Sequence, residues 1–334
     1  MDNEIYDISE FSEALLDEEY STDWYNEVPV QGFSFRPDGL SLAFNFGRGV
    51  TVEANPKTPR VLEGILERLQ IEGVGLRRLE TGELSDVLNK VAEKATGEAT
   101  IAVKHGSVVA CLSSGDSGND FRHLTSSEVF EKTTQSIHML CGGEEDEFCG
   151  AIGDMYVTAD YLLPLQKMLD GVSYKVGVKL NTSDFGRSAV HFLATLQNGG
   201  VKLPVFERAI KHRDNNAMDE IEETLTMLEK SVNDGSVRLE ALKGLTISNP
   251  AGTMRRIGKK FKLPKKDVVP VIASYEAAGN APCSAFHVYE MFCEGLVKYE
   301  RKAKAEYYRH FSSIMLSLIG INWDDYDLPG SFSR

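Results

Sequence analysis

The sequence predicts an α+β protein in which antiparallel hairpins and a sheet lie mainly before residue 200 and the C-terminal third is helical. Three observations lead to this prediction. Turn residues such as Asn, Asp, Gly and Pro separate short runs rich in β-branched and aromatic residues in the first part of the chain. Apolar residues recur at helical spacing in the last third. The 42% hydrophobic content of the 334 residues is enough to bury a sizeable core.

Three regions are expected along the chain: an acidic N-terminal arm over 1–27, an α+β core over 28–240, and a helical region over 241–334 packed on that core. The first 30 residues hold ten acidic residues and no Lys or Arg. They therefore carry −10 of the net charge of −14. Apolar residues in this arm keep a helical spacing, so a short helix can form there.

The region before residue 113 is expected to hold hairpins and two helices. Pro37-Asp38-Gly39 and His105-Gly106 supply the turns of two hairpins. Pro59 begins one helix, because Pro is well tolerated at the first helical position. The expected strands cover 28–36, 40–46, 99–104 and 108–112, and a second helix is expected over 84–95.

The middle of the chain is expected to form a hairpin between strands at 172–180 and 188–196. A polar turn from Asn181 to Gly186 separates them, and a second turn follows the hairpin. We mark seven positions here as a functional turn. They are Asn181, Ser183, Asp184, Gly186, Asn198, Gly199 and His212. Helices are expected over 127–140, with Thr125 or Ser126 as the cap, and over 159–170.

The last part of the chain shows helical periodicity almost throughout. The expected helices cover 217–232, 251–261, 265–276 and a long segment from 285 to 318. The aromatic residues of the last segment fit core packing better than a platform for stacked bases. A strong concentration of cations falls between two of these helices. It comprises Arg255, Arg256, Lys259, Lys260, Lys262, Lys265 and Lys266.

Several classes of protein are disfavoured by the sequence. The acidic start lacks the basic residues of a signal peptide, and no apolar run reaches the roughly 20 residues of a membrane span. We therefore expect a cytoplasmic protein without a membrane partner. The five cysteines lack the close pairs of a zinc site, which favours free thiols, and neither a metal nor another cofactor is expected.

The triplet Asp184-Phe185-Gly186 matches the magnesium-binding motif of protein kinases. The Gly-rich loop, the lysine strand and the His-Arg-Asp motif that a kinase also needs are missing from the sequence. A turn at a hairpin tip accounts for the triplet, because Asp bonds its own backbone and Gly tolerates positive φ.

Four short motifs occur in a familiar order. They read Gly-Phe-Ser-Phe-Arg-Pro-Asp-Gly at 32–39, Ile-Ala-Val-Lys-His-Gly-Ser-Val-Val-Ala at 101–110, Asn-Thr-Ser-Asp-Phe-Gly at 181–186, and Phe-Lys-Leu-Pro-Lys-Lys at 261–266. This order resembles the phage/plasmid-like proteins grouped as domain of unknown function 932, over roughly residues 28–310. The resemblance implies carriage on phages, plasmids and integrated elements, beside DNA-processing genes, and it implies no established reaction.

The first functional hypothesis is an accessory protein of a mobile element, acting without catalysis in recombination or in handling single strands. Its expected partner is nucleic acid, single-stranded DNA more than a specific duplex, held by the cations from Arg255 to Lys266. A solvated helix face is the plain alternative for the same residues. The acidic arm would compete with DNA for these cations.

Two other hypotheses stay open. The chain is an enzyme of unknown reaction if Asp184, His191, His212 and Asp214 converge in a pocket, although a packed core histidine explains His191 better than a catalytic role does. It is an acidic protein-binding or inhibitory module, such as a DNA mimic or anti-restriction protein, if the N-terminal acids meet a host or phage protein. Assembly into a homo-oligomer is compatible with each hypothesis.

Overall fold

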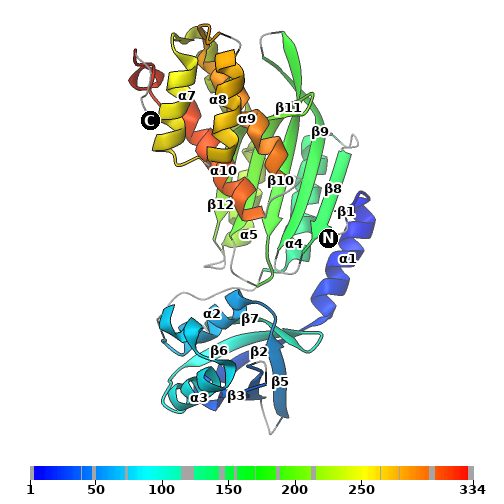
Figure 1. Cartoon of the computed structure of the whole chain (residues 1–334). Helices are drawn as coiled ribbons and strands as arrows, with labels where there is room; N and C mark the ends of the chain where they lie inside the picture. The colour runs from blue at the N-terminus through cyan, green and yellow to red at the C-terminus, as the bar shows by residue number, and fades with distance from the viewer. Residues whose placement is uncertain are drawn as a thin grey trace.

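The computed structural model has an α+β fold with two sheets and a helical C-terminal region, which confirms the predicted class (Figure 1). The structure describes residues 4–38, 40–46, 50–71, 74–113, 124–142, 147–153, 156–169, 171–185, 189–211, 216–263, 265–277, 279–300 and 305–329. Gly186, His212 and Asp214 of the predicted sites lie outside these ranges.

The larger sheet has six strands in the order β1-β8-β9-β10-β11-β12, and all neighbouring pairs are antiparallel. The strands are Glu4–Ile5 (β1), Glu147–Ile152 (β8), Val157–Leu169 (β9), Val172–Thr182 (β10), Val190–Asn198 (β11) and Val201–Ile210 (β12). The predicted central hairpin is confirmed as β10–β11. Its register places Leu180 opposite Phe192 and Asn181 opposite His191.

The smaller sheet also has six strands, in the order β2-β6-β7-β5-β4-β3, and its β5–β7 pair is parallel. The strands are Thr22–Pro29 (β2), Ser34–Phe35 (β3), Leu42–Phe46 (β4), Val50–Pro56 (β5), Glu98–Lys104 (β6) and Ser107–Ser113 (β7). Both predicted hairpins of this region are present, as β3–β4 and β6–β7.

The helices begin largely where the sequence signals predict. Thr58 caps the helix at Pro59, and Thr125 forms a capping box with Glu128. The α-helices are Ile8–Tyr20 (α1), Pro59–Arg68 (α2), Thr81–Ala92 (α3), Ser126–Leu140 (α4), Ala217–Thr226 (α5), Leu228–Ala241 (α6), Pro250–Lys260 (α7), Lys265–Ala277 (α8), Ala285–Glu300 (α9) and Ala305–Ile319 (α10). The short elements are 3-10 turns at Val30–Gly32, Val74–Arg78, Leu242–Gly244 and Trp323–Asp325, and a small pair of strands, β13 (Thr246–Ile247) and β14 (Cys283–Ser284).

Helices cover both faces of the larger sheet. Successive side chains of a strand point to opposite faces. Tyr161 on β9 packs against Phe130 of α4, which places α4 on one face. Glu207 of β12 lies in the neighbouring row and bonds Ser313 of α10, which places α10 on the other face. The cap formed by α7 to α10 therefore lies on the face opposite α4 (Figure 1).

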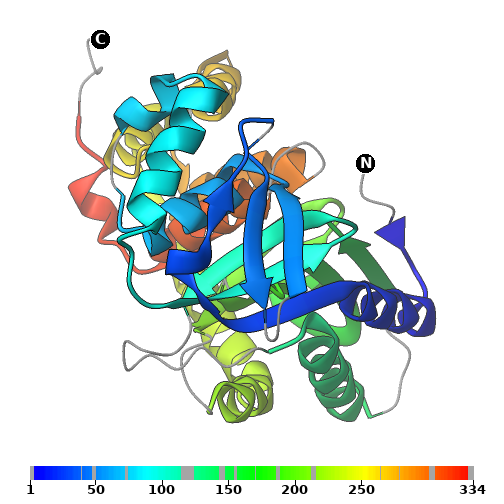
Figure 2. The same ribbon diagram turned by 90° about the horizontal axis from the view of Figure 1, so that it is seen from below.

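The predicted single core over 28–240 is divided in the structure. The strands and helices of residues 22–113 enclose one hydrophobic core, which includes Phe44, Ile65 and Leu88. The rest of the described chain encloses a larger hydrophobic core around the larger sheet, which contains β8 to β12. The two sheets lie one beneath the other in Figure 1, and helices α2 and α3 belong to the smaller one (Figure 2).

Several predicted elements differ from the structure. The helix expected over 217–232 is divided into α5 and α6, and the strand expected over 28–36 is interrupted by the 3-10 turn at Val30–Gly32. The helix expected over 159–170 is wrong, because this segment is strand β9, whose side chains alternate between buried and partly exposed over Val157–Pro164. The polar run expected after the turn at Asn198 is strand β12. Its charged residues Glu207 and Arg208 stand at the sheet edge, where strand pairing tolerates polar side chains.

The acidic N-terminus is not a separate arm. Residues 4–5 pair with β8, helix α1 packs on the larger sheet, and β2 pairs with β6 of the smaller sheet. Phe11 is fully buried against Phe130 and Phe148. The apolar face of α1 supplies the binding energy that holds this highly charged segment in place.

Candidate nucleic-acid interface

The predicted basic cluster lies where α7 ends and α8 begins. Asn249 caps α7 by accepting a hydrogen bond from the backbone N–H of Gly252 at 3.2 Å, and Pro250 occupies the first turn. Met254 and Ile257 are buried beneath the helix. The cations of α7 therefore point away from the core, and the last of them gather at its C-terminal end, where they complement the helix dipole.

A tight connection brings the lysines of both helices to one corner. The backbone N–H of Leu263 bonds the carbonyl of Gly258 at 2.9 Å, and Lys262 takes a positive φ of 55°. Five lysine side chains are exposed around this connection. We call them the lysine corner; they are Lys259, Lys260, Lys262, Lys265 and Lys266.

The two arginines of the predicted cluster have structural contacts. Arg255 pairs with Glu276 of α8 at 2.5 Å between Nη2 and Oε1. Arg256 donates from Nη1 to the carbonyl of Tyr326 at 2.9 Å. These contacts tie α7 to α8 and to the C-terminal segment, so the arginines contribute less free charge than their sequence position indicates.

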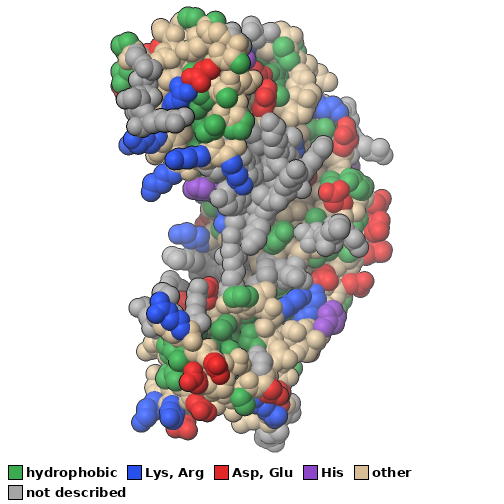
Figure 3. All heavy atoms as spheres, in the orientation of Figure 1, with side chains coloured by type: hydrophobic (Ala, Val, Ile, Leu, Met, Phe, Trp, Pro, Cys, Tyr) green, Lys and Arg blue, Asp and Glu red, His purple; other side chains and the backbone are tan. Residues whose placement is uncertain are grey.

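The lysine corner retains uncompensated charge. In the described part of the chain, no carboxylate lies within ion-pair distance of Lys260, Lys262 or Lys265. Lys and Arg side chains gather at the lower edge of the α7–α8 region in Figure 3, beside a hollow on that side of the molecule. The acidic helix α1 lies on the opposite side in Figures 1 and 2, so it does not occupy the corner.

The predicted functional turn splits between the two ends of β11. Asn198 and Gly199 form the β11–β12 turn, where Asn198 donates to the carbonyl of Ser173 at 2.7 Å and Gly199 and Gly200 have positive φ. Asn181, Ser183 and Asp184 lie at the other end of the hairpin. The two groups lie at opposite ends of β11, so they do not form one site.

The end of the hairpin near Asp184 is a joint between the two sheets. Asp184 accepts a hydrogen bond from the backbone N–H of Ser126 in the first turn of α4, where a carboxylate is favoured by the helix dipole. Phe185 packs against Ala102, Val109 and Ala110 of the smaller sheet. Its ring centroid lies 6.3 Å from that of Trp24.

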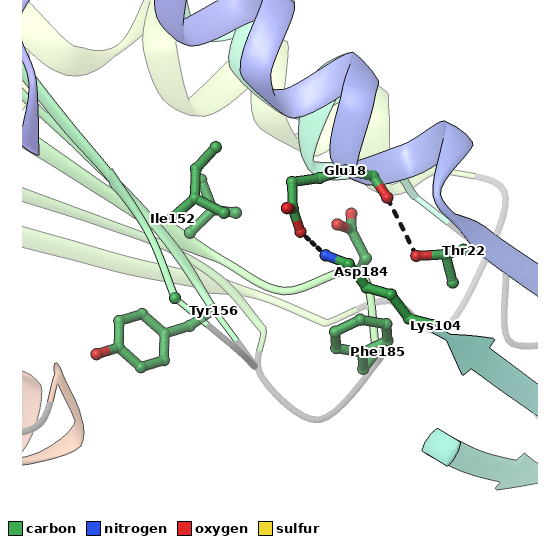
Figure 4. Close-up of a pocket in the computed structure, with 9 residues that line it drawn as sticks. Glu18, Thr22, Lys104, Ile152, Tyr156, Asp184 and Phe185 are labelled. Atoms are coloured by element: carbon green, nitrogen blue, oxygen red, sulfur yellow. Dashed lines mark hydrogen bonds and ion pairs between the residues drawn. The ribbon is translucent and has the colours of Figure 1, made fainter. Parts of the chain in front are cut away.

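A small pocket lies within this joint (Figure 4). Its lining includes the ion pair of Glu18 with Lys104, together with Tyr156, Asp184 and Phe185. Its volume of about 10 Å³ holds at most a water molecule. The joint is therefore a packed contact rather than a substrate site.

Replacing Asp184 by Ala should lower the free energy of unfolding by about 1–2 kcal/mol, because the first turn of α4 loses a charged acceptor. Urea unfolding followed by circular dichroism measures this effect. Asp234→Ala, an exposed position within α6, is the matched control and should change stability little. Equal stability of Asp184→Ala and the wild type would mean that the carboxylate does not support α4.

A polar cluster absent from the sequence predictions lies on the opposite face of the larger sheet. The His191 ring is 2% exposed and its Nε2 bonds Glu207 Oε1. The hydroxyl of Ser313 on α10 donates to the same carboxylate, at 2.6 and 2.7 Å from its two oxygens. Burial raises the pKa of Glu207, but the bonds from His191 and Ser313 outweigh it, so the pKa is lowered overall.

The grouping of Asp184 with His191 as an acid–base pair does not form. Asp184 supports α4 on one face, and His191 bonds Glu207 beneath α10 on the other. Asn181 is the cross-strand neighbour of His191, and within the described residues neither the buried Asn181 Oδ1 nor His191 Nδ1 has a hydrogen-bond partner. No local pattern predicts the contacts of Glu207 or Ser313, because these residues lie 16 and 122 positions from His191 along the chain.

Comparisons with protein-family models, with curated proteins and with solved structures found no match to this chain. The resemblance to domain of unknown function 932 therefore stays a prediction. Within the described ranges, no three or more His, Cys, Asp or Glu side chains are grouped so that they could hold a metal ion. None of the described helices is both long and apolar enough to cross a membrane. All five cysteines are free thiols.

Proposed function

We propose that this chain binds the phosphate backbone of nucleic acid, single-stranded DNA in particular, as a non-catalytic accessory protein of a phage or plasmid. The lysine corner is the observation that carries the proposal. Lysine ammonium groups contact phosphates as point charges, and such contacts position a strand without reading its bases. An interface made of lysines therefore favours binding without sequence specificity.

The distribution of charge over the molecule supports DNA binding at the lysine corner. The chain has a net charge of −14, which would repel a polyanion from most of its surface. Glu4 and the acidic residues of α1 lie at the edge of the larger sheet formed by β1, while the lysine corner lies in the helical region beyond β12. A strand is thus attracted to one side and repelled from the other.

The proposal predicts that neutralising the corner weakens DNA binding. Lys260→Gln, Lys262→Gln and Lys265→Gln together should reduce the affinity for a fluorescent thymidine 30-mer by about tenfold or more at low salt. Fluorescence anisotropy measures this change, with a duplex of the same length for comparison. The chain should prefer the single strand.

The matched control changes three other lysines by the same total charge. Lys167→Gln, Lys175→Gln and Lys230→Gln lie on β9, β10 and α6, away from the corner. At physiological ionic strength, where long-range charge effects are screened, this variant should lose less than about threefold in affinity, and the corner variant should still lose more than the control. Equal losses in the two triple variants, or no binding by the wild type, would contradict the proposal.

A second candidate function rests on helix α1. The N-cap and the helix present four exposed acidic residues, which are Asp7, Glu10, Glu13 and Asp17. The burial of Phe11 holds the helix in place. A rigid row of acids suits a basic protein partner, as in a DNA mimic. Glu10→Gln, Glu13→Gln and Asp17→Asn together should abolish the retention of a DNA-binding host or phage protein that the wild type captures. Retention by both forms would exclude this role.

A further inference from the structure

A second basic site lies on the smaller sheet, well separated in sequence from the lysine corner. A cavity of about 340 Å³ opens between the C-terminal ends of α2 and α3. Arg68 and Gln70 contribute from the end of α2, and Lys90 and Lys94 contribute from the end of α3. Leu69 and Val91 supply an apolar part of its lining. No acidic residue lines the cavity among the residues that the structure describes.

The cations of this cavity are poorly compensated. In the part of the chain that the structure describes, Lys90 and Lys94 have no carboxylate within ion-pair distance. They also stand four positions apart, Lys90 in the last turn of α3 and Lys94 just beyond its end, and their like charges repel. Arg68 Nη2 lies 3.2 Å from Glu67 Oε1, but Glu67 is 71% exposed and such surface pairs contribute little.

Two further features point to a ligand at this place. Among the residues that the structure describes, the buried Nε of Arg68 has no hydrogen-bond partner, and a buried donor is costly when it is left unpaired. Gln70 follows the end of α2 with a φ of 55°, a position where helices usually have Gly. The Gln side chain at this strained position lines the cavity and can donate from its amide.

The helix dipoles explain only part of this arrangement. A cation in the last turn of a helix is stabilising, which accounts for Arg68 and Lys90. It does not account for Lys94, which lies beyond the end of α3, for the unpaired Nε of Arg68, or for a Gln at a position suited to Gly. An anion between Arg68, Lys90 and Lys94 would compensate the charges of these three cations together.

We propose that this cavity binds a dianionic phosphomonoester attached to an organic group. Arg68, Lys90 and Lys94 would surround the phosphate, and Gln70 would donate to one of its oxygens. Leu69 and Val91 would contact the attached group. A free mononucleotide and the phosphorylated end of a DNA strand both present this chemistry. Inorganic phosphate alone should occupy this cavity, so its binding can be tested separately from DNA binding at the lysine corner.

Isothermal titration calorimetry on the full chain tests the proposal with inorganic phosphate and adenosine monophosphate as probes. Both should bind saturably with a stoichiometry of one. Lys90→Gln with Lys94→Gln should weaken binding at least tenfold, whereas Lys230→Gln on α6 and the triple variant of the lysine corner should bind as the wild type does. Circular dichroism verifies that each variant is folded. Weaker phosphate binding by Gln70→Gly, which relieves the backbone strain, would add support.

Two DNA probes distinguish the sources of the phosphate. A thymidine oligomer with a 5′-phosphate that binds more tightly than the 5′-hydroxyl form, with the difference lost in the Lys90/Lys94 variant, identifies a strand end. Equal binding of the two oligomers, with adenosine monophosphate still bound, identifies a free nucleotide. No saturable binding of phosphate or adenosine monophosphate, or equal binding by the wild type and the Lys90/Lys94 variant, overturns the proposal.

Discussion

Replacing Phe11 by Ala should lower the free energy of unfolding by about 3–5 kcal/mol. The ring is fully buried, and its centroid lies 4.9 Å from that of Phe130 and 5.3 Å from that of Phe148. Gly150 leaves room for it, because a Cβ there would stand 2.4 Å from Phe11 Cδ2. The substitution empties a closely packed site that neighbouring strands cannot refill.

Urea unfolding of Phe11→Ala measures this loss and tests whether the acidic N-terminus is an integral part of the fold. Leu16→Ala is the matched control, because Leu16 lies on the same helix and is 40% exposed. It should cost less than about 1 kcal/mol. Similar small losses in both variants would mean that α1 is only loosely attached, as the sequence alone predicts for an arm.

Replacing Glu207 by Gln should lower the free energy of unfolding by about 2–3 kcal/mol. The carboxylate accepts hydrogen bonds from Ser313 and bonds the buried His191, so it joins β11, β12 and α10. Gln keeps the size of the side chain but loses the charge. Ser313→Ala, which removes only the hydroxyl, should cost about 1 kcal/mol.

The pH dependence of stability gives a separate test of Glu207. Its pKa is lowered in the folded chain relative to its ordinary value of 4.5. The unfolded chain therefore binds more protons in this range, and the stabilisation by Glu207 is present above pH 4.5 and lost as the pH falls through the lower folded-state pKa. The difference in stability between wild type and Glu207→Gln should narrow below pH 4.5. A constant difference from pH 7 to pH 3 would contradict this role.

Local signals in the sequence predicted much of the fold. Pro59 at a helix start, the cap at Thr125 and the Gly-containing turn after Asn198 act over a few residues, and each appears where expected. The segment 159–170 was misjudged because its apolar residues fit both helical and alternating spacing. Pairing with β8 and β10, which no local pattern reveals, makes it a strand.

Site residues that are close in sequence could also be predicted, whereas those brought together from distant segments could not. The lysine corner was predictable because its residues are close in sequence and a tight turn keeps them close in space. Glu207 with Ser313, and Arg68 with Lys94, come together only through the folding of distant segments. Asp184 and His191 are near in sequence but act on opposite faces of the sheet. Because a turn lies between Asp184 and His191, their spacing along the chain does not show which face of the sheet each side chain joins.

The salt dependence of DNA binding tests the role of the lysine corner most directly. If about five lysines contact phosphates of a single strand, the logarithm of the affinity should fall against the logarithm of salt concentration with a slope of roughly −3 to −4. Removing Lys260, Lys262 and Lys265 should make the slope shallower by about 2, while the control triple variant keeps the wild-type slope. A slope that is the same in all three proteins would show that the strand is bound elsewhere.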